Sequence, residues 1–264
     1  MIQRLPTKAV KGAAAFSKSI SILQLIADSP EPPTTAKLVE RTGMPRPTLH
    51  RILKALAAEE MVEVRADKTF ILGARMIQLS GRALKQNDLV KSAEPELEWL
   101  CNQTQESNHL AIRAGQELIY IVGRDSPHAV RIASTVGGRV PFHASALGKA
   151  YLAFLPEAER EMIITSIEMP RLTKYTITTE AELRAESDQV RRDGYAVSHQ
   201  QSDVEVECYA TCVFDRNGNA IAGIGVSVPL YRLKPDKSVY LNPLRECRDR
   251  IVTKLGGNPN PSNL

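Results

Sequence analysis

The amino-acid sequence predicts an α+β protein of two domains, and three features of the 264-residue chain support this prediction. The first is a series of short helical segments followed by one hairpin in residues 1–90. The second is a set of strand-like segments, with helices before and after them, in residues 91–264. The third is charge: the first part holds 14 Lys and Arg against 8 Asp and Glu, and the second holds 20 against 22. This asymmetry favours a polyanionic partner for the first part, with a solvated basic face as the alternative.

The composition is that of a globular protein, with 43% apolar and 24% charged residues. No apolar run reaches about 18 residues, and the first residues lack the apolar core of a signal peptide. We therefore expect a cytoplasmic protein without a membrane partner. Four scattered cysteines do not suffice for a disulfide framework, so reduced thiols are expected.

Two helices are expected in the first forty residues or so of the chain. The first covers residues 20–29, with Ser17 or Ser19 as its N-cap and a proline-rich stretch after it. The second covers residues 35–42 and is followed by Gly43, because glycine readily adopts the left-handed conformation that ends a helix.

The stretch GMPRPTLHRILKAL, residues 43–56, predicts a third helix with two different faces. Its prolines lie in the first turn, where backbone amides have no partner within the helix. Apolar residues follow the i, i+3, i+4, i+7 spacing of one buried stripe, formed by Leu49, Ile52, Leu53 and Leu56. The outer face, its flanks and the first turn hold mainly polar and cationic residues, namely Arg46, Pro47, Thr48, His50, Arg51 and Lys54.

A short helix, a tight turn and a helix with a cationic outer face are typical of a helix-turn-helix, whose second helix enters the major groove of duplex DNA. An unrelated helical hairpin is the alternative. Residues 62–72 predict a β-hairpin that forms a wing carrying Arg65 and Lys68. The wing and the charge favour double-stranded DNA as the partner, contacted by the outer face of the third helix and by these two cations.

Residues 73–87 have an amphipathic helical pattern, which we interpret as a connecting helix. Its apolar side can pack on its own domain or on a second copy of the chain. Symmetric DNA half-sites favour the second copy.

The sequence of residues 91–264 predicts an antiparallel sheet of about six strands with helices packed on it. The expected strands are residues 109–114, 117–124, 130–134, 195–200, 207–215 and 219–229. Helices are expected over residues 95–101, from Ala146 onward, and over residues 156–164, 179–194 and 241–255.

The segment HASALGK, residues 143–149, places small residues where a loop becomes a helix. Ser145 can cap this helix, and the exposed amides at its start can hold a carboxylate. The alternative is simply a capped helix whose Gly148 allows close packing. These residues alone leave both interpretations open.

Cys208 and Cys212 lie four residues apart in an expected strand, so their side chains share one face. They suggest a metal pair or a nucleophile. No further ligands are spaced for a tetrahedral metal site, and no base with an orienting carboxylate accompanies a nucleophile. We therefore interpret them as buried small residues and expect no metal, no cofactor and no catalytic residue.

Six segments resemble, in order and spacing, the isocitrate lyase regulator (IclR) family of transcriptional regulators: SKSISILQLIA, LVERTGMPRPTLHRILKAL, LGARMIQLSGRAL, HASALGKAYLA, RRDGYAV and CYATCVFDRNGNAIAGIGVSVP. The resemblance implies a regulator with a winged helix-turn-helix, a linker helix and a GAF-like effector-binding domain, assembled as a homodimer or homotetramer. The corresponding boundaries are an N-terminal arm (1–16), the DNA-binding domain (17–72), the linker (73–90), the effector-binding domain (91–257) and a tail (258–264).

The resemblance also implies an effector pocket for a small organic acid, aromatic or aliphatic. Its expected residues are Ile132, His143, Ser145, Ala146, Leu147, Ser198, Cys208, Gly225 and Ser227. Ser198 stands where an acidic residue is frequent, Gly225 where serine is common, and Glu205 where glycine is frequent. The polar recognition pattern of better-known pockets is therefore partly missing, which leaves the identity of the effector open rather than the existence of a pocket. His199, next to Ser198, can donate a hydrogen bond to the effector in place of an acidic residue at 198. The alternative is that His199 is simply an exposed loop residue.

Two other functions stay open as alternatives. An enzyme with an accessory winged helix would convert a small acid into a product. A ligand-binding or scaffolding protein without regulatory function would show no salt-dependent binding to duplex DNA.

Overall fold

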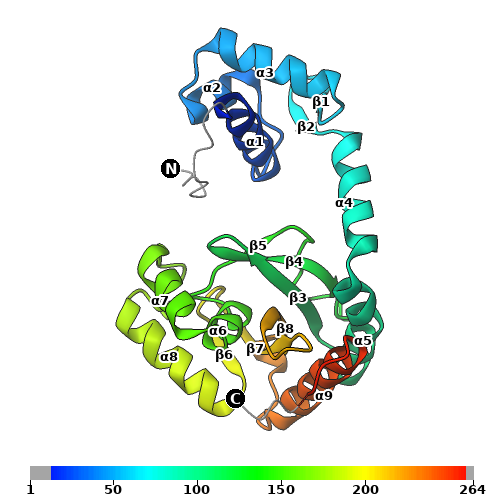
Figure 1. Cartoon of the computed structure of the whole chain (residues 1–264), viewed down its shortest axis with the longest axis vertical. Coiled ribbons are helices and arrows are strands. Elements are labelled where there is room, and N and C mark those ends of the chain that lie inside the picture. Colours follow the sequence, from blue (N-terminus) through cyan, green and yellow to red (C-terminus); the bar gives the residue numbers. More distant parts are fainter. Residues whose placement is uncertain (1–12, 260–264) are drawn as a thin grey trace. The chain divides into compact units, whose positions relative to one another are not determined.

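The computed structural model describes residues 13–259, and it divides the chain into two compact units with the boundary between Gln86 and Asn87. Most of the predicted N-terminal arm, residues 1–12, and most of the predicted tail, residues 260–264, lie outside the described residues. Figure 1 shows the elements of each unit. Each unit also has its own apolar core.

The first unit is helical with one small hairpin. Its elements are α1 (Ala14–Ala27), α2 (Thr35–Thr42), α3 (Arg46–Ala58), β1 (Val62–Val64), β2 (Phe70–Leu72) and α4 (Ala74–Gln86). Ile22 of α1, Leu38 of α2 and Leu49 of α3 have no exposed surface, so the three helices share one core. Burial of each such side chain contributes on the order of 2 kcal/mol relative to leaving it exposed.

The predicted cap of α1 is wrong. Ser17 and Ser19 lie inside the helix, which begins at Ala14, and the Ser19 hydroxyl donates to the carbonyl of Ala15 at 3.1 Å. The alanines before Ser17 are strong helix formers, so they extend α1 toward its N-terminus.

The turn between α2 and α3 forms as predicted. Thr34 caps α2 by accepting from the Lys37 amide, and Gly43 ends it with φ +64°. Pro45 precedes α3 and Pro47 lies in its first turn, where neither proline removes an intrahelical hydrogen bond.

The helix predicted over residues 73–87 ends at Gln86. The side chain of Asn87 accepts hydrogen bonds from the amides of Leu89 and Val90 and caps a new helix, α5 (Asp88–Thr104). Both of these apolar residues are buried, so they belong to the core of the second unit.

The second unit contains a six-stranded antiparallel sheet with the strand order β5-β4-β3-β8-β7-β6, which confirms the predicted α+β class. The strands are β3 (Ser107–Ala114), β4 (Glu117–Arg124), β5 (Arg139–Val140), β6 (Ala196–His199), β7 (Val206–Phe214) and β8 (Ala220–Pro229). Hairpins join β3 to β4 and β7 to β8, and β3 pairs with β8 in the middle of the sheet.

The strand predicted at residues 130–134 does not form. This segment is irregular, and the short β5 forms the edge of the sheet instead by pairing with Leu118 and Ile119. Exposure alternates there without strand pairing, since Arg131 and Ala133 are exposed and Ile132 and Ser134 are half-buried, and all four residues line a cavity.

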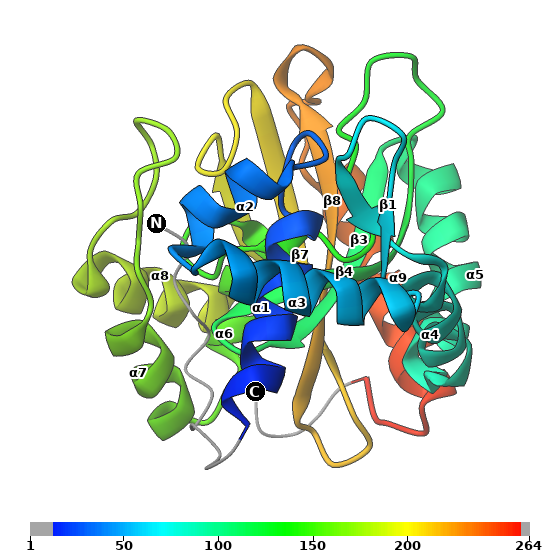
Figure 2. The same cartoon turned by 90° about the horizontal axis from the view of Figure 1, so that it is seen from above.

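Helices cover both faces of the sheet (Figures 1 and 2). On one face lie α5 and α9 (Ser238–Lys254), where Tyr240 stacks on Tyr209 with ring centroids 5.5 Å apart. On the other face lie α6 (Ala146–Ala153), α7 (Glu157–Ser166) and α8 (Glu180–Asp193). Gly194 ends α8 with φ +76°, as its position in the sequence predicted.

Candidate functional site

The outer face of α3 is exposed and cationic. Leu49, Leu53 and Leu56 are buried, which turns the opposite side chains toward solvent. Arg46, Pro47, His50, Arg51 and Lys54 are exposed and Thr48 is half-buried. Within residues 13–259, no hydrogen bond or ion pair engages the side chains of Arg46, His50, Arg51 or Lys54. The charges of the two arginines and the lysine therefore remain free for an external anion.

The hairpin tip holds two further cations in a defined turn. Asp67 accepts from the Thr69 amide at 3.0 Å and from its hydroxyl at 2.6 Å, and these hydrogen bonds lower the pKa of Asp67. Lys68 adopts φ +63°, and both Arg65 and Lys68 are exposed. The amide of Phe70 donates to the carbonyl of Pro33 at 3.0 Å, which anchors the hairpin to the segment before α2.

The second unit encloses a cavity of about 420 Å³. Its floor is the sheet, and one side is the start of α6. Two loops complete it: the β4–β5 loop, residues 125–138, and the β6–β7 loop, residues 200–205. The volume suits a small molecule.

Seven of the nine effector residues expected from the sequence line this cavity. They are Ile132, Ser145, Ala146, Leu147, Cys208, Gly225 and Ser227. The other two, His143 and Ser198, are buried but are not among its lining residues. His143 Nε2 lies 3.0 Å from the carbonyl oxygen of Pro170, and the Ser198 hydroxyl donates to the carbonyl of Ala144 at 2.8 Å. Both side chains thus fix the segment that leads into α6.

The start of α6 combines the two interpretations of the HASALGK segment. Ser145 Oγ accepts from the Gly148 amide at 2.9 Å and donates to the carbonyl of Pro141 at 2.7 Å, which caps the helix. A Cβ atom at Gly148 would lie 2.4 Å from that same carbonyl oxygen, so only glycine fits this close contact. In the described part of the chain, the amides of Ala146 and Leu147 have no hydrogen-bond partner, and both residues line the cavity. Free amides at a helix start attract anions.

The floor of the cavity depends on Gly225. This residue pairs with His109 on β3 and with Ala210 on β7, and a Cβ atom there would lie 3.3 Å from Leu147 Cδ2 and 2.8 Å from the carbonyl oxygen of Tyr209. Because residue 225 is glycine, where the resemblance predicts serine, Leu147 can pack closely against the sheet.

The remaining floor groups are uncharged. The Cys208 thiol donates to Ser227 Oγ at 3.3 Å, and burial raises the pKa of this thiol to about 11, so it stays protonated at pH 7. Burial also lowers the pKa of His109 to about 4, which keeps its ring neutral at pH 7. Neither group has the ionisation that nucleophilic or acid catalysis at neutral pH requires.

The charged lining residues are Arg131, Arg139 and Asp203. Arg131 Nε lies 3.1 Å from Asp125, and Arg139 lies 2.5 Å from Glu117. All three belong to or border the two loops. Sequence patterns did not identify them, nor His109, Tyr120 or Ser202, because strand pairing and loop folding bring them together rather than any local spacing.

The β6–β7 loop is held by a fully buried lysine of α6. Lys149 Nζ donates to Glu186 on α8 at 2.6 Å, to the carbonyl of Val197 at 2.5 Å and to Gln201 at 2.6 Å. Burial lowers the pKa of the Lys149 ammonium, and the Glu186 carboxylate partly offsets this. Glu205 is the last residue of this loop and adopts a positive φ of +61°. The family resemblance predicts glycine at this position.

Between residues 13 and 259 there is no cluster of three or more His, Cys, Asp or Glu side chains arranged to bind a metal. A membrane span would need a longer and more apolar helix than any found in that range.

Comparison with known families agrees with this geometry. The model of the bacterial transcriptional regulator IclR C-terminal domain matches residues 81–253, and the IclR helix-turn-helix domain matches residues 15–66. The chain belongs to the IclR family. Its members are DNA-binding transcriptional regulators, and this identity assigns the helix-turn-helix to DNA.

Individual IclR relatives match along nearly the whole chain. The regulator KdgR of Escherichia coli is 30% identical over 246 residues, which is 92% of this chain and 93% of that protein. The repressor AllR of Klebsiella pneumoniae is 30% identical over 253 residues, 95% of this chain and 93% of that protein.

Solved IclR structures share the fold. The regulator from Alicyclobacillus acidocaldarius is 25% identical, with a TM-score of 0.82 over 92% of this chain and 98% of that one. An IclR homologue from Microbacterium hydrocarbonoxydans, solved in complex with 4-hydroxybenzoate, is 23% identical, with a TM-score of 0.79 over 92% of this chain and 99% of that one.

The contacts of Lys149 should contribute to the stability of the second unit. We expect Lys149→Met to lower the free energy of unfolding of the second unit by about 3 kcal/mol, because it leaves a partly buried carboxylate and two other acceptors without their donor. Urea unfolding followed by the fluorescence of Trp99, the chain's one tryptophan, measures this change. Lys91→Met removes an exposed pair with Asp88 and serves as the matched control, for which we expect no change. Equal midpoints for the two variants would contradict the prediction.

Proposed function

We propose that this IclR-family chain binds operator DNA through the outer face of α3 and the hairpin tip, and that a small carboxylic acid in the cavity controls this binding. The observation that carries the proposal is the set of exposed cations on α3 that have no protein partner in the described residues. An operator-binding role also places the protein with the chromosome, in the cytoplasm.

The two kinds of cation on α3 suit different parts of DNA. The planar guanidinium groups of Arg46 and Arg51 can donate two hydrogen bonds to a guanine edge. Lys54, Thr48 and His50 suit phosphate oxygens, which position the helix without reading the sequence. Arg65 and Lys68 at the hairpin tip extend the phosphate contacts beyond the groove.

A small acid suits the cavity for two reasons. Ala146 and Leu147 at the start of α6 line the cavity, and their amides, which have no partner in the described residues, favour a carboxylate. Arg131 also lines the cavity, and within the described residues its pair with Asp125 uses only Nε, so its other guanidinium nitrogens can donate to a carboxylate. The homologue solved with 4-hydroxybenzoate supports an organic acid as the class of effector.

The helix α4 suits a second copy of the chain. It has no buried residue, although Met76, Ile77, Leu79, Ala83 and Leu84 are apolar and lie within one half of its circumference. Ile77 is 73% exposed and Leu79 is 52% exposed. A homodimer, alone or paired into a homotetramer, covers this face and presents two recognition helices to a two-fold symmetric operator.

Control by the acid requires two dimer arrangements with different affinities for DNA. An acid that binds one of them more tightly shifts the population toward it and changes the spacing of the two α3 helices. Acid binding with equal affinity to both would change nothing.

The first prediction concerns operator binding. We expect Arg51→Ala to weaken binding by about 1–3 kcal/mol and to relax specificity at one base pair, whereas Lys54→Ala weakens binding to all duplexes and reduces the salt slope by about one. Fluorescence anisotropy with operator and scrambled duplexes at two salt concentrations measures both effects. A uniform loss for Arg51→Ala reassigns this residue to phosphate, and no loss for either variant rejects the DNA-binding face.

The second prediction concerns the acid. A thermal-shift screen with pyruvate, gluconate, phenylacetate and 4-hydroxybenzoate is expected to identify at least one stabilising ligand, since a ligand at 100 times its Kd stabilises by about 2.7 kcal/mol. The same acid should change operator affinity. Stabilisation without any change in operator affinity would reject the control mechanism and retain the binding site. Appearance of a product in the same mixtures would instead support the enzymatic alternative.

The third prediction concerns assembly. Ile77→Glu places a charge on the apolar face of α4, so we expect a smaller assembly by analytical ultracentrifugation and weaker operator binding. Gln78→Glu adds the same charge at the adjacent exposed position and should change neither. An unchanged mass for Ile77→Glu would exclude α4 from the interface.

A further inference from the structure

The β4–β5 loop, residues 125–138, supplies much of the cavity wall but has no regular structure of its own. Arg131, Ile132, Ala133 and Ser134 line the cavity, and the segment lies between the end of β4 and the start of β5. A ligand that contacts such a segment must offset the entropy of ordering it, unless the protein orders it in advance.

Both ends of this loop are fixed by hydrogen bonds. At its start, the Ser126 hydroxyl donates to the carbonyl of Gln105 at 2.7 Å, and the Ser126 amide donates to Ser107 Oγ on β3 at 3.0 Å. At its end, the amide of Gly137 donates to the carbonyl of Tyr120 at 2.8 Å. These hydrogen bonds do not involve the middle of the loop, residues 129–133.

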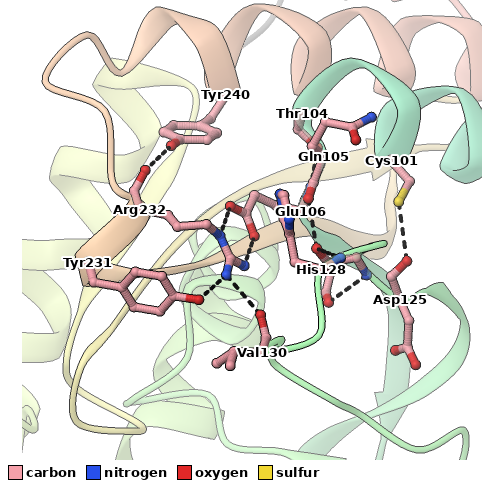
Figure 3. Close-up of polar contacts among 12 residues, drawn as sticks. Cys101, Thr104, Gln105, Glu106, Asp125, His128, Val130, Tyr231, Arg232 and Tyr240 are labelled. Atoms are coloured by element: carbon pink, nitrogen blue, oxygen red, sulfur yellow. Dashed lines mark hydrogen bonds and ion pairs between the residues drawn. The ribbon is translucent and has the colours of Figure 1, made fainter.

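The middle of the loop is held by one arginine from a distant part of the chain (Figure 3). Arg232, in the short 3-10 helix after β8, donates from Nη1 to the carbonyl of Val130 at 2.8 Å. In the described residues, this is the one hydrogen bond that joins residues 129–133 to a segment outside the loop. It acts on the residue directly before the four that line the cavity.

The same guanidinium is fixed in place by a buried carboxylate. Arg232 donates from Nε to Glu106 Oε1 at 2.9 Å and from Nη2 to Oε2 at 2.7 Å, and only 5% of the Glu106 side chain is exposed (Figure 3). This two-bond fork sets the plane of the guanidinium and so the direction of its remaining N–H groups. Glu106 directly precedes β3, so the direction is set from the central part of the sheet.

We propose that Arg232 and Glu106 are positioning residues of the effector cavity, which hold residues 129–133 against it before a ligand binds. This inference rests on the proposed effector site, because it assigns a role to residues that do not line the cavity. A lysine at position 232 keeps the charge but cannot bridge the carboxylate and the Val130 carbonyl with the same fork.

Trypsin provides a test of loop order that needs no ligand, since Arg131 is an exposed cleavage site within the loop. In the full-length protein we expect cleavage after Arg131 to be about tenfold faster in Arg232→Lys than in the wild type, because the open population of the loop rises when its charged hydrogen bond is lost. Mass spectrometry of the fragments identifies this cut among all others.

Two further variants separate the local effect from a general loss of stability. The double variant Glu106→Gln with Arg232→Met removes the arginine without leaving a buried carboxylate unpaired, and it should also accelerate the cut after Arg131. Arg113→Met is the matched control, because Arg113 likewise joins a carboxylate, that of Glu159, to a backbone carbonyl, that of Gly115, away from the loop. It should leave the cut after Arg131 at the wild-type rate.

Binding of 4-hydroxybenzoate and of pyruvate, measured by calorimetry, provides the second readout. For an acid that binds the wild type, we expect Kd to rise about tenfold in Arg232→Lys and to stay unchanged in Arg113→Met. Wild-type cleavage after Arg131 in both Arg232 variants, or equal acceleration at every site, would overturn the inference. A wild type that binds neither acid would count against the proposed effector class, and proteolysis would still decide the role of Arg232.

Discussion

The ammonium group of Lys149 joins four parts of the second unit at one buried point. It extends from α6 and bonds to α8, to the backbone of β6 and to the β6–β7 loop. Because a buried ammonium is costly unless all its donors are used, this contact fixes where α6 lies on the sheet. The start of α6, one turn earlier, is thereby held beside the cavity. The β6–β7 loop, which also lines the cavity, is held by the same ammonium group. The anion-attracting amides of Ala146 and Leu147 depend on that placement.

The first unit follows from a different constraint, which is the division of α3 into two faces. Leucines bury one face against α1 and α2, and the cations left outside form no ion pair within residues 13–259. A polyanion provides the missing partners. Family membership and this electrostatic arrangement therefore lead independently to DNA.

Much of the fold was accessible from the sequence because local chemistry determines it. Apolar spacing identified α3, and glycines with left-handed geometry ended α2 and α8. The strand expected at residues 130–134 does not form, because this segment belongs to an irregular loop that lines the cavity and pairs with no strand. The helix α1 begins at Ala14, before the predicted caps Ser17 and Ser19. The helix-forming alanines here outweigh the preference of serine for the N-cap position.

The effector site was only partly predictable. Residues at the start of α6 and on β7 and β8 were found through the family resemblance, whereas His143 and Ser198 are used in backbone contacts instead. The pair of Glu106 and Arg232 is separated by 126 residues, so no local pattern could associate them.

The floor of the cavity is built from paired strands, whereas most of its charged groups lie in or beside two irregular loops. Substitutions on the floor disturb the packing of α6 on the strands, as at Gly225, whereas loop residues can be exchanged without that cost. Descendants of this protein can thus acquire a new chemical signal through a few loop substitutions while they keep the same operator, and regulation can be rewired without a new fold.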